Sequence, residues 1–282
     1  MEIILGQKAG FCYGVKNVVE KSSEIVKNEK NIYCLGELVH NKQVMDELEN
    51  EGLIVVNDIN EIPNGNKVIF RAHGIIKEIY DIAKSKELEV IDLTCPSVLA
   101  IHKKAGKYSE DGYVILIGEK KHPETIGTKS FASQGYVIED YEDIPNAIEN
   151  FEKSKLKKIY IIAQTTFSVE KFDKICSEIK KLSTNVEIIV DKTICNATRL
   201  RQEETEEIAK KVELMIIIGG KNSANTKKLY DISIANCKNA ILVQTKEDID
   251  INLVHKYEKI GIMAGASTPD KSIQDIVEYI KN

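Results

Sequence analysis

The sequence predicts an α/β protein built on parallel sheets. Its strand candidates are short β-branched runs, and each is followed by a small residue, a polar loop and a helical pattern. This alternation of strand and helix is typical of parallel sheets. The chain has 282 residues, of which 43% are apolar and 29% charged, a composition that favours folded domains over disorder. At about 150 residues per domain, the length predicts two domains or three small ones.

Composition also narrows the class of partner. Lys and Arg total 39 and Asp and Glu total 44, so the formal net charge is −5 and argues against binding to duplex nucleic acid. No apolar run approaches the roughly 18 residues that would span a membrane. The amino terminus, residues 1–6, has neither a basic leader nor the apolar stretch of a signal peptide. We therefore expect a cytoplasmic protein with no nucleic-acid or membrane partner.

The residues that follow the strands recur in three ordered sets. In the first set a glycine ends the strand and a polar residue lies four positions later; the strands are Ile32–Leu35, Tyr113–Ile117 and Leu214–Ile218, and the polar residues are His40, His122 and Ser223. In the second set, strands Lys67–Phe70, Ile159–Ala163 and Ile260–Met263 lead to His73, Thr165 and Ser267. In the third set, strands Glu89–Asp92, Glu187–Asp191 and Ile3–Leu5 lead to Cys95, Cys195 and Cys12.

This order predicts a threefold repeat of about 90 residues, with three βα units in each repeat. The first strand and Cys12 complete the last repeat, so the repeat is circularly permuted. The predicted domains are residues 13–95, residues 96–193, and residues 194–282 together with 1–12. Ligands of α/β proteins bind at the carboxyl ends of strands, so three pseudo-symmetric units would bring these residues to one centre.

The six cysteines contain no Cys-x-x-Cys pair, so a metal site must collect its thiolates from distant parts of the chain. Cys12, Cys95 and Cys195 are the candidates because of their matched places after strands. Thiolates favour zinc, copper(I) or an iron–sulfur cluster, and a cubane held by three cysteines leaves one iron open. Cys34, Cys176 and Cys237 are interpreted as small buried side chains.

The polar residues of the other two sets suit an anionic ligand. Histidine, serine, threonine and asparagine beside helix starts can bind a phosphate or diphosphate; the candidates are His40, His73, His122, Thr165, Ser223, Asn225 and Ser267. Glu124 is the conspicuous carboxylate among them, and a carboxylate in an anion pocket suggests a general acid. His102 and His255 match nothing in the repeat and are interpreted as surface or helix residues, and Arg199–Lys211 as a solvated helix face.

Eight ordered motifs resemble those of the 4-hydroxy-3-methylbut-2-enyl diphosphate reductase family of the non-mevalonate isoprenoid pathway. They span nearly the whole chain and are Gly10–Val15, Val39–Asn41, Arg71–Gly74, Asp92–Pro96, His122–Glu124, Gln164–Thr166, Thr193–Cys195 and Ala266–Pro269. The resemblance implies a trefoil of three pseudo-symmetric small α/β domains around a central iron–sulfur site. One departure is visible: the family commonly has Ser-Ser-Asn where this chain has Ser223-Ala224-Asn225, which removes one hydroxyl.

Carried onto matching positions, the resemblance implies that Cys12, Cys95 and Cys195 hold a [4Fe–4S] cluster. It implies that His40, His73, His122, Ser223, Asn225 and Ser267 contact the substrate, and that Thr165 and Glu124 lie near its hydroxyl, with Glu124 the proton source. The expected reaction is reductive dehydroxylation of 4-hydroxy-3-methylbut-2-enyl diphosphate to isopentenyl and dimethylallyl diphosphate. Substrate oxygen would bind the open iron, two electrons would arrive singly from a ferredoxin or flavodoxin, and protonation would complete the step.

Two other functions are compatible with the residues alone. An iron–sulfur hydratase would use the same open iron to remove water without net electron transfer. A zinc protein could bind or hydrolyse diphosphates without redox chemistry. The electron donor, the product ratio, the cluster potential and the oligomeric state do not follow from the sequence.

Overall fold

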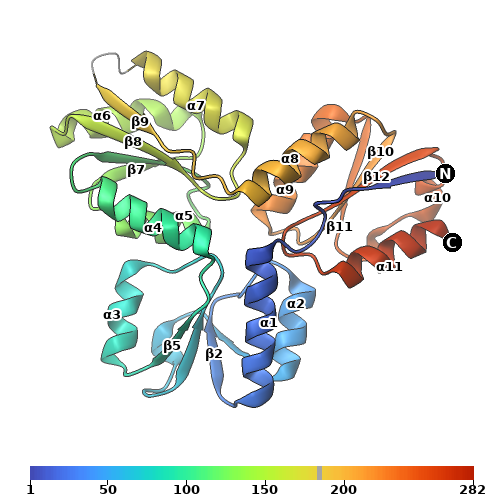
Figure 1. The fold of residues 1–282 in the computed structure, drawn as a ribbon, viewed down its shortest axis with the longest axis horizontal. Helices are drawn as coiled ribbons and strands as arrows, with labels where there is room; N and C mark the ends of the chain where they lie inside the picture. Colours follow the sequence, from blue (N-terminus) through green and yellow to red (C-terminus); the bar gives the residue numbers. More distant parts are fainter. Residues whose placement is uncertain (183–185) are drawn as a thin grey trace. The chain divides into compact units, whose positions relative to one another are not determined.

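The computed structural model describes residues 1–182 and 186–282. Within them the chain forms three four-stranded parallel sheets flanked by helices (Figure 1), so the predicted α/β class is confirmed. The chain divides into two compact units, which are considered separately. The first unit comprises residues 1–21, 39–50 and 196–282, and the second comprises residues 22–38 and 51–195.

One sheet of the second unit has the strand order β3-β2-β4-β5. The elements along this part of the chain are α1 (Tyr13–Asn28), β2 (Ile32–Leu35), α2 (Lys42–Glu51), β3 (Ile54–Val56), the 3-10 helix η1 (Ile59–Glu61), β4 (Lys67–Phe70), α3 (Lys77–Ser85) and β5 (Glu89–Asp92).

The other sheet of the second unit has the order β7-β6-β8-β9. Its elements are α4 (Pro96–Tyr108), β6 (Tyr113–Ile117), α5 (Pro123–Phe131), β7 (Gly135–Ile138), η2 (Tyr141–Asp143), α6 (Ile144–Ser154), β8 (Lys158–Ala163), α7 (Val169–Leu182) and β9 (Glu187–Val190).

The sheet of the first unit has the order β11-β10-β12-β1. Its elements are β1 (Glu2–Leu5), α8 (Asn196–Ala209), β10 (Leu214–Ile218), α9 (Ala224–Asn236), β11 (Asn239–Val243), η3 (Lys246–Asp248), α10 (Ile251–Val254), β12 (Lys259–Ala264) and α11 (Asp270–Lys281).

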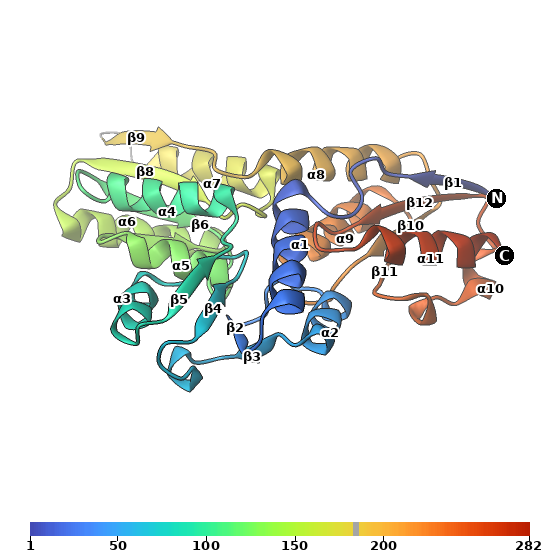
Figure 2. The ribbon, with the colours of Figure 1, turned by 60° about the horizontal axis from the view of Figure 1, so that its bottom comes forward.

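The three sheets share one topology, in which the second strand along the chain lies at the edge, beside the first. A backbone hydrogen bond also recurs in all three sheets. The glycine after the first strand donates its N–H to the carbonyl oxygen of the last residue of that edge strand; the glycines are Gly36 (2.7 Å), Gly118 (2.9 Å) and Gly219 (2.9 Å). In the third sheet the last position is taken by β1, which pairs with β12 in parallel (Figure 2). This pairing agrees with the expected permutation, while the exact domain boundaries stay a prediction.

The expectation of three βα units per repeat was wrong by one strand. β3, β7 and β11 form the outer edge of each sheet. They carry little sequence signal, since β3 has only three residues and β7 begins at a glycine. The other nine strands of the described chain lie where the sequence predicts them, within one residue at each end.

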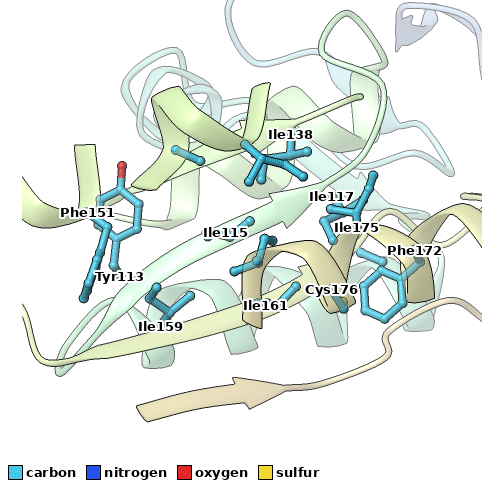
Figure 3. Close-up of a cluster of buried hydrophobic side chains, with 14 of the residues drawn as sticks. Tyr113, Ile115, Ile117, Ile138, Phe151, Ile159, Ile161, Phe172, Ile175 and Cys176 are labelled. Atoms are coloured by element: carbon cyan, nitrogen blue, oxygen red, sulfur yellow. The ribbon is translucent and has the colours of Figure 1, made fainter. Parts of the chain in front are cut away.

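Both faces of β6 are covered, which explains its unbroken apolar run in the sequence. On one face Tyr113, Ile115 and Ile117 pack with Phe151 of α6 and Phe172 of α7 (Figure 3). On the other, Val114 and Leu116 pack with Ile101 and Ala105 of α4. The sheet is therefore a rigid base for the loops at its carboxyl edge.

The expectations for the remaining cysteines and histidines were confirmed in part. Cys34, Cys176 and Cys237 are buried as expected, and burial raises the pKa of Cys34 and of Cys176 to about 12. His255 is exposed, whereas His102 lies on α4 but is only 2% exposed, so the surface alternative for it is wrong. It is buried because its ring stacks on Phe131, with 4.5 Å between ring centroids. No helix of the described chain is long and apolar enough to cross a membrane.

Candidate active site

Cys12, Cys95 and Cys195 occupy the same backbone position in the three repeats. Their N–H groups donate to the carbonyl oxygens of Ala266 (3.3 Å), Ala72 (3.0 Å) and Thr165 (3.1 Å), respectively. Each acceptor is the second residue after β12, β4 or β8, the strands next to the one that leads to the cysteine. The structure therefore gives all three cysteines one local environment, at the carboxyl edge of their own sheet.

This hydrogen bond also corrects the register of the second polar set. It aligns Thr165 with Ala72 and Ala266, so the counterpart of His73 and Ser267 is Thr166. The expectation that Thr165 matches His73 was wrong by one residue, because the sequence offers no marker for the first residue after a strand. Thr165 stays a candidate on its own contacts.

The two units each carry part of the predicted cysteine set. Cys12 belongs to the first unit, and Cys95 and Cys195 belong to the second. Among residues 1–182 and 186–282, no three His, Cys, Asp or Glu side chains are grouped so that they could hold a metal ion. A centre built from all three thiols therefore stays a prediction.

The donor chemistry of these three residues fits an iron–sulfur cluster. All three thiols are partly exposed, whereas Cys34 and Cys176 lie in the cores and their raised pKa values disfavour the thiolate that a metal requires. Three soft thiolates in repeated positions suit iron and sulfide better than oxygen-seeking metals. Cys12 also accepts the N–H of Val15 at 3.5 Å, a kind of contact that stabilises a thiolate sulfur.

The second unit brings together His73, His122, Glu124 and Thr165. The rings of His73 and His122 meet edge to face, with centroids 5.6 Å apart. His122 is the N-cap of α5, and its Nδ1 accepts the backbone N–H of Glu124 at 3.2 Å. That bond directs the proton of a neutral ring to Nε2. Pro123 at the first helical position supports this start.

Glu124 is a buried carboxyl group whose two oxygens are both held by Thr165. Oε1 accepts the backbone N–H of Thr165 at 2.5 Å, and Oε2 accepts its hydroxyl at 2.6 Å. Burial raises the pKa of Glu124 to about 7, although the two hydrogen bonds act to lower it. A carboxyl group with this pKa is able to donate a proton near neutral pH.

The first unit brings together His40, Ser223, Asn225 and Ser267. Ser267 donates its hydroxyl to the carbonyl oxygen of His40 at 3.3 Å. The His40 backbone also lies so close to Gly220 that a Cβ there would stand 2.5 Å from its oxygen. Ser223 caps α9 by accepting the N–H of Thr226 at 3.3 Å. Ser223, Asn225 and Ser267 thus follow strands of this sheet, and the His40 backbone lies against the loops that carry them. That these residues bind one ligand stays a prediction.

Asn225 contributes a buried side-chain amide to this group. It is 4% exposed, and neither its amide oxygen nor its amide nitrogen has a hydrogen-bond partner among the described residues. A buried amide without partners is costly, so its presence points to a polar ligand. Ala224, where the expected second hydroxyl is missing, opens the first turn of α9, where backbone N–H groups are available to an anion.

The polar residue four positions after the glycine is not equivalent in all three repeats. His122 and Ser223 cap their helices, but α2 begins at Lys42 and its cap is Asn41, whose Oδ1 accepts the N–H of Val44 at 3.3 Å. His40 therefore precedes the cap by one residue. The first repeat has a loop one residue longer at this point, which the glycine spacing concealed.

Sequence reasoning missed two residues that hold the loop before Cys12. Arg201, which is 3% exposed, donates from Nε to the carbonyl oxygen of Lys8 at 2.8 Å and from Nη2 to that of Gly10 at 2.9 Å. Glu204 accepts the N–H groups of Gln7 and Lys8, both at 2.8 Å. The expectation of a solvated face over Arg199–Lys211 was thus wrong for Arg201, which is buried because the loop covers it.

A related anchor precedes Cys195 in the second unit. On α4, the hydroxyl of Tyr108 donates to Asp191 at 2.6 Å and the Nζ of Lys104 lies 2.7 Å from the same carboxylate. Asp191 directly follows β9. In both cases the helix that follows one cysteine in the chain anchors the loop that leads to another.

Comparison with known proteins identifies the family. The LytB protein family matches residues 3–281. The chain belongs to this family. The 4-hydroxy-3-methylbut-2-enyl diphosphate reductase of Clostridioides difficile (strain 630) is 40% identical over 289 residues, with both chains covered completely. The reductase of Aquifex aeolicus (strain VF5) is 39% identical, with 100% of this chain and 96% of the relative covered.

Solved structures of LytB-type reductases resemble the chain in fold as well. The reductase from Plasmodium falciparum superposes with a TM-score of 0.91 at 35% identity, covering 100% of this chain and 88% of that one. A second structure, described as the terminal enzyme of the non-mevalonate pathway, has a TM-score of 0.71 at 39% identity and covers 100% and 99%. The resemblance inferred from the eight motifs is therefore confirmed, and the relatives of this LytB chain are named as reductases.

Proposed function

We propose that this LytB chain removes the allylic hydroxyl group of 4-hydroxy-3-methylbut-2-enyl diphosphate by two-electron reduction. The substrate takes up two electrons and two protons, its C–O bond breaks, and the oxygen leaves as water. The carbon skeleton is protonated at either end of the allyl group, so isopentenyl and dimethylallyl diphosphate both form. The electrons come from an external donor such as a ferredoxin or flavodoxin.

The shared backbone position of Cys12, Cys95 and Cys195 carries this proposal. It supports assigning the three thiolates as ligands of one [4Fe–4S] cluster, which would leave one iron without a protein ligand. When bound, such a cluster supplies single-electron transfer and a Lewis-acidic iron. The remaining chemistry falls to side chains of this chain.

The diphosphate group is assigned to the buried donors at the strand ends. Asn225, Ser223 and Ser267 are 4 to 7% exposed, and the amide of Asn225 has no other partner among the described residues. His40, His73 and His122 supply ring N–H groups, and these are stronger donors to an anion when protonated. Fixing the diphosphate here orients the allylic C–O bond for reaction.

Glu124 and Thr165 are assigned to proton delivery. The raised pKa of Glu124, about 7, keeps a proton on much of this carboxyl group at neutral pH. When Oε2 carries the proton, the bond to Thr165 reverses: the carboxyl O–H donates to the Thr165 oxygen, and the Thr165 hydroxyl is free to donate onward. The Thr165 hydroxyl, 2.6 Å away, is within reach to pass the proton to the departing oxygen. Because the group is buried, the proton is not exchanged freely with water.

Anaerobic purification followed by assays for iron, acid-labile sulfide and zinc tests the proposal. We expect iron and sulfide in equal amounts, a broad visible absorption, and both diphosphate products when a viologen reductant is supplied. Turnover without reductant would favour a hydratase. A colourless protein with stoichiometric zinc, or one that binds diphosphates without turnover, would overturn the redox assignment.

A further inference from the structure

A cavity of about 380 Å³ in the second unit lies next to the candidate active site, because Pro123, between His122 and Glu124, forms part of its wall. Leu35, Asn57 and Arg71 line it, and these residues end or directly follow β2, β3 and β4. It therefore sits at the carboxyl edge of the sheet, where α/β proteins place their ligands. Its volume falls in the range of small-molecule sites. His73, His122, Glu124 and Thr165 do not line it.

The wall of the cavity is mostly branched and aliphatic. Ile59, Ile75, Ile76, Ile79 and Ile126 line it, and Ile126 on α5 is 47% exposed. An exposed isoleucine on a concave wall is a surface that a short hydrocarbon group would cover. The composition of the wall thus favours a ligand with a small apolar tail.

Arg71 is the cationic group of the cavity. Its Nε is shielded from solvent and has no hydrogen-bond partner among the described residues. The guanidinium lies over Gly36, whose φ is +75° and where a Cβ would overlap Nη1. The absence of a side chain at Gly36 therefore leaves the space that the Arg71 guanidinium occupies. A guanidinium with unused donors in a cavity is suited to a phosphate or carboxylate.

The other repeats provide an internal comparison, because Gln164 follows β8 as Arg71 follows β4. The Gln164 Oε1 accepts from the N–H of Glu119 at 2.9 Å and the hydroxyl of Thr125 at 3.2 Å, and its Nε2 donates to Thr166 at 2.8 Å. Gln164 is thus satisfied by its own domain. In the first repeat the equivalent side chain has no such partners and faces a cavity.

Two carboxylates lie near the cavity, and their negative charges bear on whether an anion can bind there. Asp58 lines the cavity, but its Oδ1 is occupied by the backbone and side-chain N–H groups of Asn60, both at 2.9 Å. Glu37 acts electrostatically on Arg71 but is exposed, so water screens its charge. Asp58 is exposed as well, so water screens both carboxylates more than it screens Arg71, whose Nε is buried.

We propose that this cavity binds a small organic anion, a phosphate or carboxylate with a short apolar tail, through Arg71 and the isoleucine wall. The anion pairs with the guanidinium, and the tail covers Ile126. The site does not depend on the proposed reductase activity. It does share elements with the active site, since Ile126 lies on α5, the helix that His122 caps.

Calorimetric titration of the anaerobically purified full chain with 3-methylbutyl phosphate tests the proposal. We expect one site that persists in Asn225→Ala, which weakens the separate diphosphate region. Arg71→Met should reduce the affinity about tenfold, since a hydrogen bond between charged groups contributes this much. Ile126→Asp, at an exposed position that does not threaten folding, should also reduce it. Arg199→Met, which removes an exposed arginine elsewhere, should not.

Three further ligands test separately whether the anionic group and the apolar tail each contribute to binding. Inorganic phosphate probes the anion alone, 3-methylbutanol the tail alone, and 3-methylbutanoate distinguishes carboxylate from phosphate. Both fragments should bind more weakly than the intact anion. Binding that is unchanged in Arg71→Met and Ile126→Asp, or that disappears in Asn225→Ala alone, would overturn the site while leaving the reductase proposal intact. No binding of either organic anion at millimolar concentration would overturn it as well.

Discussion

Thr165 holds both carboxylate oxygens of Glu124, one through its backbone N–H and one through its hydroxyl. The backbone bond fixes the position of the carboxylate, and the hydroxyl gives it a single outlet for a proton. Burial and hydrogen bonding oppose each other here, and burial dominates, so the pKa of Glu124 stands near 7. The pair is built to hold a proton and to release it to a ligand.

Replacing Glu124 with glutamine should remove the proton source and keep the shape of the site. We expect kcat to fall by about 10²- to 10⁴-fold, the usual contribution of a positioned acid, with little change in substrate affinity. Product formation with a viologen reductant and the dissociation constant of the substrate would be measured together. Glu149→Gln, which removes an exposed carboxylate on α6, should behave as the wild type. Near-normal turnover of Glu124→Gln would contradict a proton role.

The pH dependence of turnover should follow the protonation of Glu124. The protonated fraction decreases as the pH rises through about 7, so kcat should decrease on the alkaline side. Thr165→Val removes the hydroxyl bond that lowers the pKa, so the alkaline limb should move to higher pH even though the maximum rate is lower. Rate profiles from pH 5 to 9 for both proteins would measure the shift. A limb at the same pH in both would argue that another group controls it.

The sequence predicts strands and cysteine positions well for a physical reason. Runs such as Leu214–Ile218 are buried on both faces and so stay apolar, and the small residue after each marks the turn. Edge strands are only partly covered, and β3, with three residues, has no such signal. The sequence therefore predicts the two central strands of each sheet and the edge strand that leads to the cysteine, and it misses β3, β7 and β11 at the opposite edge.

Contacts between distant segments are the part that could not be predicted. Arg201 stands in a run of charged residues, and nothing local separates it from Arg199, which is only partly buried. What distinguishes it is the loop of residues 7–10, more than 190 positions earlier, which covers it. Asn225 was predicted as a ligand contact from its place beside a helix start and from the family resemblance, but the lack of partners of its amide is visible only in the structure.

Arg201 and Glu204 should act as positioning residues for Cys12. Arg201→Lys keeps a charge but loses the fork that spans Lys8 and Gly10, so we expect a loop that holds Cys12 less firmly. The cluster-free chain should then show faster alkylation of Cys12, with Cys95 and Cys195 unchanged. The reconstituted chain should retain less iron. Peptide mass spectrometry after timed alkylation and iron analysis would measure both effects.

The adjacent exposed pair on α8 provides the matched control. Arg199 and Glu203 form an ion pair at 2.7 Å on the solvent side of the same helix. Arg199→Lys and Glu203→Gln should leave Cys12 alkylation and iron content as in the wild type. Equal loss of iron in all three variants, or faster alkylation of every cysteine in Arg201→Lys, would indicate general destabilisation and not a local effect on Cys12.

His102 should make the stability of the fold depend on pH in the acidic range. Neither ring nitrogen has a partner among the described residues, and burial lowers the pKa of His102 to about 4. In the unfolded chain the ring titrates near 6.5. Because the folded state disfavours the charged ring, its contribution is complete above pH 6.5 and is lost as the pH falls toward 4.

We therefore expect the free energy of unfolding to fall by about 1 to 2 kcal/mol between pH 6.5 and 5 through this residue. Glu124 has the opposite effect over an overlapping pH range, because its raised pKa stabilises the folded state at lower pH. The effect of His102 is therefore measured as the difference between a variant that lacks this ring and one that keeps it. His102→Leu fills the space between Phe131 and Gly74 without a titrating group and should lack this part of the pH dependence. His255→Leu, at an exposed histidine, should keep it. Denaturant titrations at both pH values would measure the free energy of unfolding. If it changes between pH 6.5 and 5 as much in His102→Leu as in the wild type, the buried ring does not have the lowered pKa.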